Sequence, residues 1–268
     1  MPRSYDIADL TAAFRWGGLG PGDVVFTHSN IALFGKPVWA YSAETLCEGV
    51  CRAFREVIGP EGTLVVPVFT YSYCRGEVFN PAASASDCGL LAEWVRTRPG
   101  ALRSEDPIFS VAALGPQAGA LTRDVPRECF GSGSFWTRLV EANGWICNLN
   151  VFEAGSTLFH YVERKLGVPY RFDKVFEGVT EKDGRREKTS AVYFCRRLDD
   201  PRAVPNNDAF SRLAYDRGVA RKIPVGGGTV AMIRARDVVR LIEETLPSRP
   251  WLLTAADGGA PEPQDKHA

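Results

Sequence analysis

Histidine is scarce in this chain, and the scarcity limits both its acid–base chemistry and its metal chemistry. Only three histidines occur in 268 residues, and His267 lies next to the end in a polar stretch. His28 and His160 are therefore the only histidines away from the chain ends, and histidine is the side chain whose unperturbed pKa allows proton transfer near neutral pH. Two such residues are too few for a histidine-rich metal site, so we expect no bound metal.

Net charge and long apolar runs are also absent. Lysine plus arginine equal aspartate plus glutamate at 32 each, which argues against a nucleic acid or an anionic membrane as partner. The start of the chain has no apolar signal segment, and no run approaches the roughly 18 apolar residues that span a bilayer. The seven cysteines include no C-x-x-C pair. These features predict a cytoplasmic protein in a reducing compartment, without structural zinc.

Three motifs of nucleotide-binding proteins and hydrolases are missing. The sequence has no G-x-x-x-x-G-K-[ST] P-loop, no G-x-G-x-x-G fingerprint after a strand and no G-x-S-x-G nucleophile elbow. Two loops rich in glycine and hydroxyl side chains, 29–35 and 131–134, can still offer backbone donors to a phosphate-bearing ligand. The residues alone therefore point to a phosphate-bearing cosubstrate and one general base.

Short apolar runs alternate with amphipathic segments along the chain. The predicted strands are 24–28, 62–69, 109–114 and 145–151, and the predicted helices are 6–16, 42–58, 90–97, 135–142 and one that begins near 156. This alternation predicts an α/β fold, namely a single α-β-α layered domain over residues 1–254 with a mostly parallel central sheet.

The last third of the chain has a different pattern. Lys182, Asp183 and Gly184 separate two apolar-rich runs, 172–180 and 187–195, and predict an added antiparallel hairpin. Predicted helices at 207–217 and 236–246 flank a predicted strand at 228–233. Glycine, proline and charge dominate 255–268, which predicts a disordered tail.

The stretch from Gly155 to Glu163 contains the most informative histidine. Small residues at 155–157, followed by apolar residues at helical spacing, predict a helix that begins near Ser156 or Thr157. His160 and Glu163 then share one helix face, where the carboxylate can hold the imidazole in one tautomer and stabilise its cation. The alternative is a half-buried helix histidine with an incidental neighbour.

With these residues in view, the sequence resembles the aminoglycoside 3-N-acetyltransferase family. The resembling blocks keep the family's order over most of the chain. They are 22–29 with Gly35, 61–69, 79–81, 89–93, Arg96, 99–104, 110–115, 130–131 and 157–163.

The resemblance implies acetyl transfer from acetyl-CoA to a primary amine, usually on an aminocyclitol or amino sugar. Carried over by position, His160 is the expected catalytic base and Glu163 its support. Thr157, or backbone donors beside it, would stabilise the developing oxyanion.

The resemblance also implies a channel for the cosubstrate. Its expected lining is His28, Ser29, Asn30, Gly35, Lys36, Arg103, Ser104 and Ser110. Structural roles are the alternatives: His28 can bond a neighbouring carbonyl, Ser29 and Ser104 can serve as turn or cap residues, and Arg103 can pair with a structural carboxylate.

The chain departs from the family pattern in several places. Asp106 stands where members commonly carry a histidine, Phe135 stands where proline is usual, and the strand end 147–150 reads Cys-Asn-Leu-Asn. The catalytic block is intact, so these changes bear on the acceptor more than on activity.

Four basic residues follow the His160 helix, namely Arg164, Lys165, Arg171 and Lys174. They suggest a neutral or anionic acceptor such as a nucleotide-linked amino sugar, unless they form a solvated basic face. Transfer of another acyl group, and a non-catalytic CoA- or sugar-binding relative, are the remaining alternatives. We expect a small-molecule amine as partner, a role in antibiotic resistance or biosynthesis, and leave a homodimer open.

Overall fold

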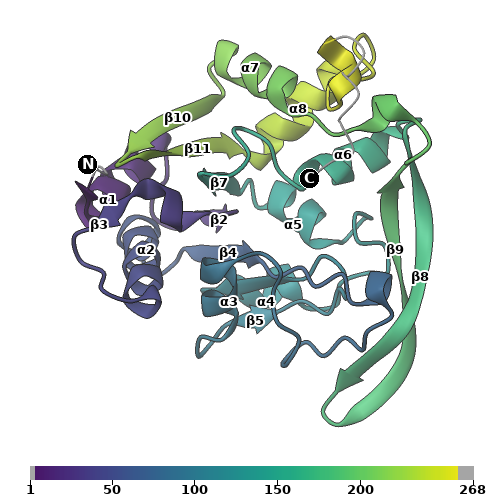
Figure 1. The fold of residues 1–268 in the computed structure, drawn as a ribbon, viewed down its shortest axis with the longest axis horizontal. Helices are drawn as coiled ribbons and strands as arrows, with labels where there is room; N and C mark the ends of the chain where they lie inside the picture. The colour runs from purple at the N-terminus through teal and green to yellow at the C-terminus, as the bar shows by residue number, and fades with distance from the viewer. Residues whose placement is uncertain (1–3, 259–268) are drawn as a thin grey trace, which may run out of the picture.

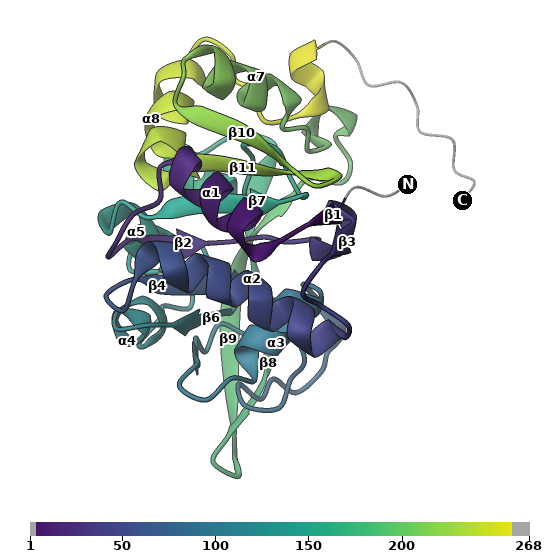
Figure 2. The same cartoon turned by 90° about the vertical axis from the view of Figure 1, so that its left-hand side faces the viewer.

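A seven-stranded sheet forms the centre of the computed structural model, which describes residues 4–258. The strands lie in the order β10, β11, β7, β2, β4, β6, β5, which Figures 1 and 2 show together. In that order their bounds are Ala220–Val225, Gly228–Arg234, Trp145–Leu149, Val24–Phe26, Thr63–Pro67, Val111–Leu114 and Leu102–Arg103.

The sheet is mixed. β7, β2 and β4 pair in parallel at its centre, and antiparallel strands extend it on both sides. Five of the seven strands consequently run in one direction, and only β11 and β6 run against them. The predicted strand direction is confirmed, although parallel pairing is confined to the three central strands.

Helices cover both faces of the sheet, as predicted. One face carries α1 (Ile7–Gly17), α2 (Ala43–Ile58) and α3 (Leu90–Arg96), which Figure 2 shows in front of the strands. The other carries α4 (Ala118–Thr122), α5 (Phe135–Glu141), α6 (Leu158–Leu166), α7 (Asp208–Asp216) and α8 (Ala235–Thr245).

Alternating strand residues supply the two hydrophobic cores. In β2, Val24 and Phe26 face the core of α4 to α8, whereas Val25 faces the core of α1 to α3. In β4, Val65 and Val66 divide in the same way. Successive side chains of a strand point to opposite faces, so a strand that is apolar throughout must be covered on both sides.

Local capping explains where the first two helices begin. Asp6 accepts a hydrogen bond from the Asp9 amide and forms a capping box at α1, and Gly18 ends that helix with φ 109°. Ser42 caps α2 in the same manner. Both starts follow the prediction from the sequence.

The predicted hairpin is a long ribbon outside the main sheet. β8 (Arg171–Lys182) pairs with β9 (Arg185–Arg196) over their full lengths, and the turn places Asp183 and Gly184 at φ 50° and 73°. Such positive values are typical of a two-residue hairpin turn. Figure 1 shows the ribbon along one side of the molecule.

Strand β10 was not predicted from the sequence, and the start of the disordered tail was predicted too early in the chain. Lys222 and Pro224 interrupt the apolar pattern of β10, but an edge strand tolerates both. Residues 255–258 form a turn of 3₁₀ helix, and the Ala255 amide donates to the Val204 carbonyl at 2.8 Å. The predicted tail therefore cannot begin before 259, and positions 259–268 lie outside the described residues.

Smaller elements complete the fold. They are a two-stranded ribbon of β1 (Ser4–Tyr5) and β3 (Lys36–Pro37), and 3₁₀ turns at Ile31–Phe34, Tyr73–Arg75 and Pro201–Ala203. Within residues 4–258, the structure contains no helix with the length and apolar character that crossing a bilayer requires.

Close packing holds the ribbon against the 3₁₀ turn at Tyr73. The Tyr73 hydroxyl bonds Thr180 at 2.6 Å and also bonds Thr189. A Cβ added at Gly178 would lie 2.5 Å from the Tyr73 ring. Gly178→Val should therefore lower the free energy of unfolding by roughly 1–3 kcal/mol in urea titrations, the usual cost of overpacking. Glu177→Val, at the exposed neighbouring position, is the matched control and should change stability little.

Candidate active site

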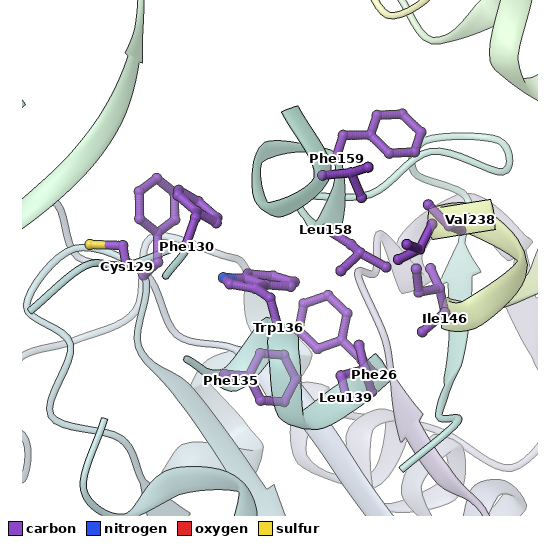
Figure 3. Packing of buried hydrophobic residues seen from close by; sticks show 14 of the residues in the cluster. Phe26, Cys129, Phe130, Phe135, Trp136, Leu139, Ile146, Leu158, Phe159 and Val238 are labelled. Carbon is purple, nitrogen blue, oxygen red and sulfur yellow. The ribbon is translucent and has the colours of Figure 1, made fainter. Parts of the chain in front are cut away.

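Helix α6 places His160 at the edge of a packed core. Leu158, Phe159 and Val162 are buried, and Figure 3 shows Leu158 and Phe159 above Trp136, with Ile146 beside them. The helix ends at Gly167, whose φ is 64°. With its apolar face held in the core, α6 fixes the position of His160, whose side chain is 22% exposed.

The predicted pairing of His160 with Glu163 is present. His160 Nδ1 lies 2.8 Å from Glu163 Oε2, and the glutamate side chain is almost fully buried. An ionised carboxylate can only accept a hydrogen bond, so Nδ1 carries the hydrogen of the neutral ring. The other ring nitrogen, Nε2, is then left with a lone pair that can take a proton.

Arg171, the first residue of β8, is a second partner of the same carboxylate. Its Nε lies 2.7 Å from Glu163 Oε2, and its side chain is 5% exposed. The Nε–H does not point at the oxygen, so the contact is an ion pair rather than a directed hydrogen bond. A buried cation thus balances the buried anion behind His160.

These neighbours set the protonation state of the pair. Burial lowers the pKa of His160, and the charge of Arg171 lowers it further, against the opposing effect of Glu163. Burial by itself raises the pKa of Glu163, but His160 and Arg171 hold that pKa below its usual range. At neutral pH the carboxylate is ionised and the imidazole is neutral, which is the state a general base requires.

His160 faces a cavity of about 690 Å³ at the carboxyl ends of β2, β4 and β7. Of the predicted site residues, His28, Ser29, Asn30 and Thr157 line this cavity together with His160. In α/β sheets, ligands bind at that edge of the parallel strands, as expected here.

His28 is a hydrogen-bonding residue rather than a second base. Its Nε2 lies 3.2 Å from Thr157 Oγ1, and the rings of Phe26, Phe69 and Phe152 stand edge-on to the imidazole. Burial lowers the pKa of His28 to about 3. The ring therefore stays neutral at neutral pH, and its partner is a hydroxyl rather than the neighbouring carbonyl considered above.

Three residues expected along the cosubstrate channel do not line this cavity. Arg103 donates to the carbonyls of Pro81, Ser84 and Val68. Ser110 also donates to the Val68 carbonyl, and Ser104 accepts from the Val111 amide. Arg103 and Ser110 hold the long connection after β4 in place, and Ser104 binds the start of β6. A linear pattern does not distinguish these roles from ligand binding.

Gly35 and Lys36 also lie away from the cavity lining. Gly35 ends the 3₁₀ turn at Ile31–Phe34 with φ 100°, and Lys36 pairs with Ser4 in the β1–β3 ribbon. The loop after β2 therefore faces the cavity with its first residues only.

Two important residues were not predicted as part of the site. Asn148 donates from Nδ2 to the carbonyls of Phe152, Glu153 and Gly155, and so shapes the loop that leads to α6. Phe152, in that loop, lines the cavity with φ 49° and an exposed ring. The only signal for Asn148 was a polar residue inside an apolar strand, and Phe152 had none.

Asp106 has a structural role in this chain. Its Oδ1 accepts from the amides of Ile108 and Phe109, at 2.9 and 2.8 Å, and burial raises its pKa. The residue lies outside the lining of the His160 cavity. Where the resemblance led us to expect a histidine, this chain thus has a side chain that closes a turn.

The four basic residues after His160 do not form a free cationic surface. Arg164 pairs with Asp173, Lys165 with Glu243 and Arg171 with Glu163. Lys174 lies over the Phe176 ring. The suggestion of an anionic acceptor loses its basis, because three of the charges are already paired.

A neutral imidazole that is backed by a buried carboxylate and faces a cavity in a layered α/β domain is an arrangement suited to general-base chemistry. The family description aminoglycoside 3-N-acetyltransferase matches residues 28–247. The chain therefore belongs to the aminoglycoside 3-N-acetyltransferase family. The predicted family is confirmed, and with it the reaction class, acetyl transfer from acetyl-CoA to an amine.

Individual relatives agree along almost the whole chain. It is 31% identical to aminoglycoside N(3)-acetyltransferase VII of Streptomyces paromomycinus over 263 residues, which is 86% of each chain. It is 29% identical to aminoglycoside N(3)-acetyltransferase VIII of Streptomyces fradiae, covering 97% of this chain and 96% of that one. The crystal structure of the aminoglycoside acetyltransferase AAC(3)-Xa superposes with a TM-score of 0.77 at 27% identity, covering 91% and 94%.

The ion pair with Arg171 leads to a pH prediction. Removing this cation removes one cause of the lowered His160 pKa, so Arg171→Met should raise that pKa and move the acid limb of the kcat/KM profile to higher pH. Rates measured against pH with a saturating acetyl donor test this. Arg164→Met removes an arginine that pairs with Asp173 instead and should leave the limb in place. An unmoved limb in the Arg171 variant would contradict the prediction.

Proposed function

We propose that the protein acetylates a primary amine of an aminoglycoside or related amino sugar, with His160 as the general base. The observation that carries this proposal is the 2.8 Å contact of His160 Nδ1 with the buried Glu163, which leaves Nε2 free at the cavity. A protonated amine cannot attack a thioester. The amine therefore attacks in its neutral form, and removal of a proton from the attacking nitrogen by a positioned imidazole contributes about 10²- to 10⁴-fold in rate.

The bonds and protons of this direct transfer balance without an enzyme nucleophile. The acceptor amine reacts in its neutral form, after its ammonium group has released one proton to solvent. His160 Nε2 takes a second proton from the attacking nitrogen as the new C–N bond forms at the acetyl carbonyl, and the C–S bond breaks. The thiolate of CoA then takes a proton, so the imidazole returns to its neutral state. Glu163 stabilises the transient imidazolium, since its carboxylate already accepts from Nδ1.

Thr157 is the proposed oxyanion donor. In the tautomer with hydrogen on Nε2, His28 donates to Thr157 Oγ1 across their 3.2 Å contact. The hydroxyl hydrogen of Thr157 is then free to point at the carbonyl oxygen, where negative charge develops. Ser29 and Asn30, in the same cavity wall, remain the proposed contacts for the acetyl-CoA arm.

Charge in the cavity favours an amine-rich acceptor over a nucleotide-linked sugar. Within residues 4–258, the cavity lining includes Asp87 but neither lysine nor arginine. Asp87 itself pairs with Arg75 at 2.8 Å. A diphosphate would meet no positive side chain there, whereas relatives of this chain are named for their action on aminoglycosides.

Replacing the base should separate catalysis from binding. His160→Ala should lower kcat by about 10²- to 10⁴-fold for amine-dependent release of thiol from acetyl-CoA, because His28 and Asp87, which also line the cavity, already have partners. Binding of CoA, measured by calorimetry, should be retained. Tyr161→Phe, one position along α6, is the control and should keep wild-type turnover.

The same assay identifies the alternatives. Wild-type turnover in His160→Ala would remove the imidazole from the mechanism. Binding of CoA by the unmodified protein, with no thiol release for any amine in an aminoglycoside panel, would indicate a non-catalytic relative.

A further inference from the structure

One wall of the His160 cavity is formed by the chain that follows β2. Residues 29–32 line the cavity, and the 3₁₀ turn at Ile31–Phe34 continues from them. The Asn30 amide donates to the Leu149 carbonyl at 2.7 Å, which extends the pairing of β2 with β7 beyond the end of β2. After Asn30 the chain leaves the sheet, so contacts outside the strand ladder decide where it lies.

The side chain of Asn150, the first residue after β7, joins this wall to β11. Its Nδ2 donates to the Asn30 carbonyl at 3.1 Å, and its Oδ1 accepts from the Thr229 amide at 2.7 Å. The backbone amide of Asn150 also donates to the Thr229 carbonyl at 3.0 Å. One planar side-chain amide therefore connects β11 to the chain after β2, at the level where β7 has ended.

The backbone at position 150 restricts which residue can make these contacts. Its φ is 59°, in the left-handed region, where asparagine is enriched among residues other than glycine. Glycine would adopt this backbone but has no side chain, and an ionised aspartate would keep the acceptor but has no hydrogen to donate. Asn150 satisfies the backbone and both side-chain hydrogen bonds at once.

Gly228, the first residue of β11, leaves the space that the Asn150 amide occupies. A Cβ added at Gly228 would lie 2.0 Å from Asn150 Oδ1 and 2.9 Å from Asn150 Nδ2. The amide cannot move aside without losing its bonds to Asn30 and Thr229. A residue larger than glycine at position 228 would therefore displace it.

The turn just before Gly228 contacts the far end of the same wall. The Gly227 amide donates to the Phe34 carbonyl at 2.7 Å, and a Cβ added at Gly226 would lie 2.3 Å from that carbonyl oxygen. A Cβ at Gly227 would lie 3.5 Å from it, which is an ordinary contact distance. Of the three consecutive glycines, the first and the last thus allow the close approach of a neighbour.

We infer that Asn150 is a positioning residue for the acetyl donor. Its amide holds the Asn30 carbonyl, and with it the wall that Ser29 and Asn30 form, in a fixed place relative to β7 and β11. The inference rests on the proposed function, in which Ser29 and Asn30 contact the acetyl-CoA arm. Loss of this positioning weakens donor binding more than the chemical step, because the base His160 lies on α6, a different segment.

Two neighbouring glycine substitutions test the inference. Gly228→Ala displaces the Asn150 amide, so KM for acetyl-CoA and the calorimetric Kd for CoA should both rise about tenfold, the loss expected for one or two net hydrogen bonds. Turnover, and KM for the best acceptor of the aminoglycoside panel, should keep wild-type values. Gly227→Ala adds the same methyl group one position earlier, at an ordinary contact distance, and should change none of these quantities.

Substitutions of Asn150 itself separate its hydrogen bonds from folding. Asn150→Asp keeps the acceptor for the Thr229 amide and loses the donor to Asn30, so it should also raise Kd for CoA. Asn150→Gly keeps the left-handed backbone without overpacking and replaces Gly228→Ala if that variant does not fold. In the Asn150→Gly background, Gly228→Ala should cause no further loss, because the amide that it displaces is absent.

The outcomes separate this inference from the proposed function. Lower stability of Gly228→Ala and Asn150→Asp in urea, with an unchanged Kd for CoA, would show a purely structural role and overturn the inference while acetylation stands. Equal increases of KM for donor and acceptor would overturn it as well. A higher Kd for CoA in both variants, combined with no thiol release by the unmodified protein for any amine, would uphold the positioning of CoA and overturn the proposed function.

Discussion

The site depends on one buried carboxylate. Glu163 is shared by His160 from its own helix and by Arg171 from the first position of the hairpin, and both contacts reach the same oxygen. Removal of one partner from a buried ion pair typically costs 3–5 kcal/mol, because the remaining charge is left without compensation. The carboxylate therefore joins α6 to β8, and the same contact that holds these elements together also sets the protonation state of the imidazole.

A second constraint lies just before that helix. β7 ends at Leu149, and the Asn148 side-chain amide donates to the carbonyls of the loop that follows. These bonds keep the loop tight and place Thr157 next to His28. Parallel pairing of β7 with β2 brings the two strand ends to the same sheet edge. Residues from two distant segments, about 130 positions apart in the sequence, thus meet through sheet geometry and one side-chain amide. Phe152 lies in this loop, has an exposed ring and lines two neighbouring cavities.

Charge distribution explains why local sequence was a poor guide to the acceptor. Arg164 and Lys165 look like free cations in the sequence, yet each meets a carboxylate from a distant element. Asp208, by contrast, lies in an ordinary polar stretch at a cavity rim, where residues 4–258 supply no ion-pair partner for its charge. The field that a substrate meets depends on which charges remain unpaired after folding, and pairing is a property of the tertiary structure.

Local patterns determined the strands of the two-sided core, most helix starts, the hairpin turn and the face shared by His160 and Glu163. Each of these depends on residues a few positions apart, where periodicity and capping act directly. Tertiary structure decided that Arg171 completes the carboxylate pair and that His28 meets Thr157. It also decided that Arg103, Ser104 and Ser110 bind backbone rather than lining the His160 cavity. Such contacts join segments far apart in the chain, and a buried polar atom takes whichever partner the packed fold brings within reach.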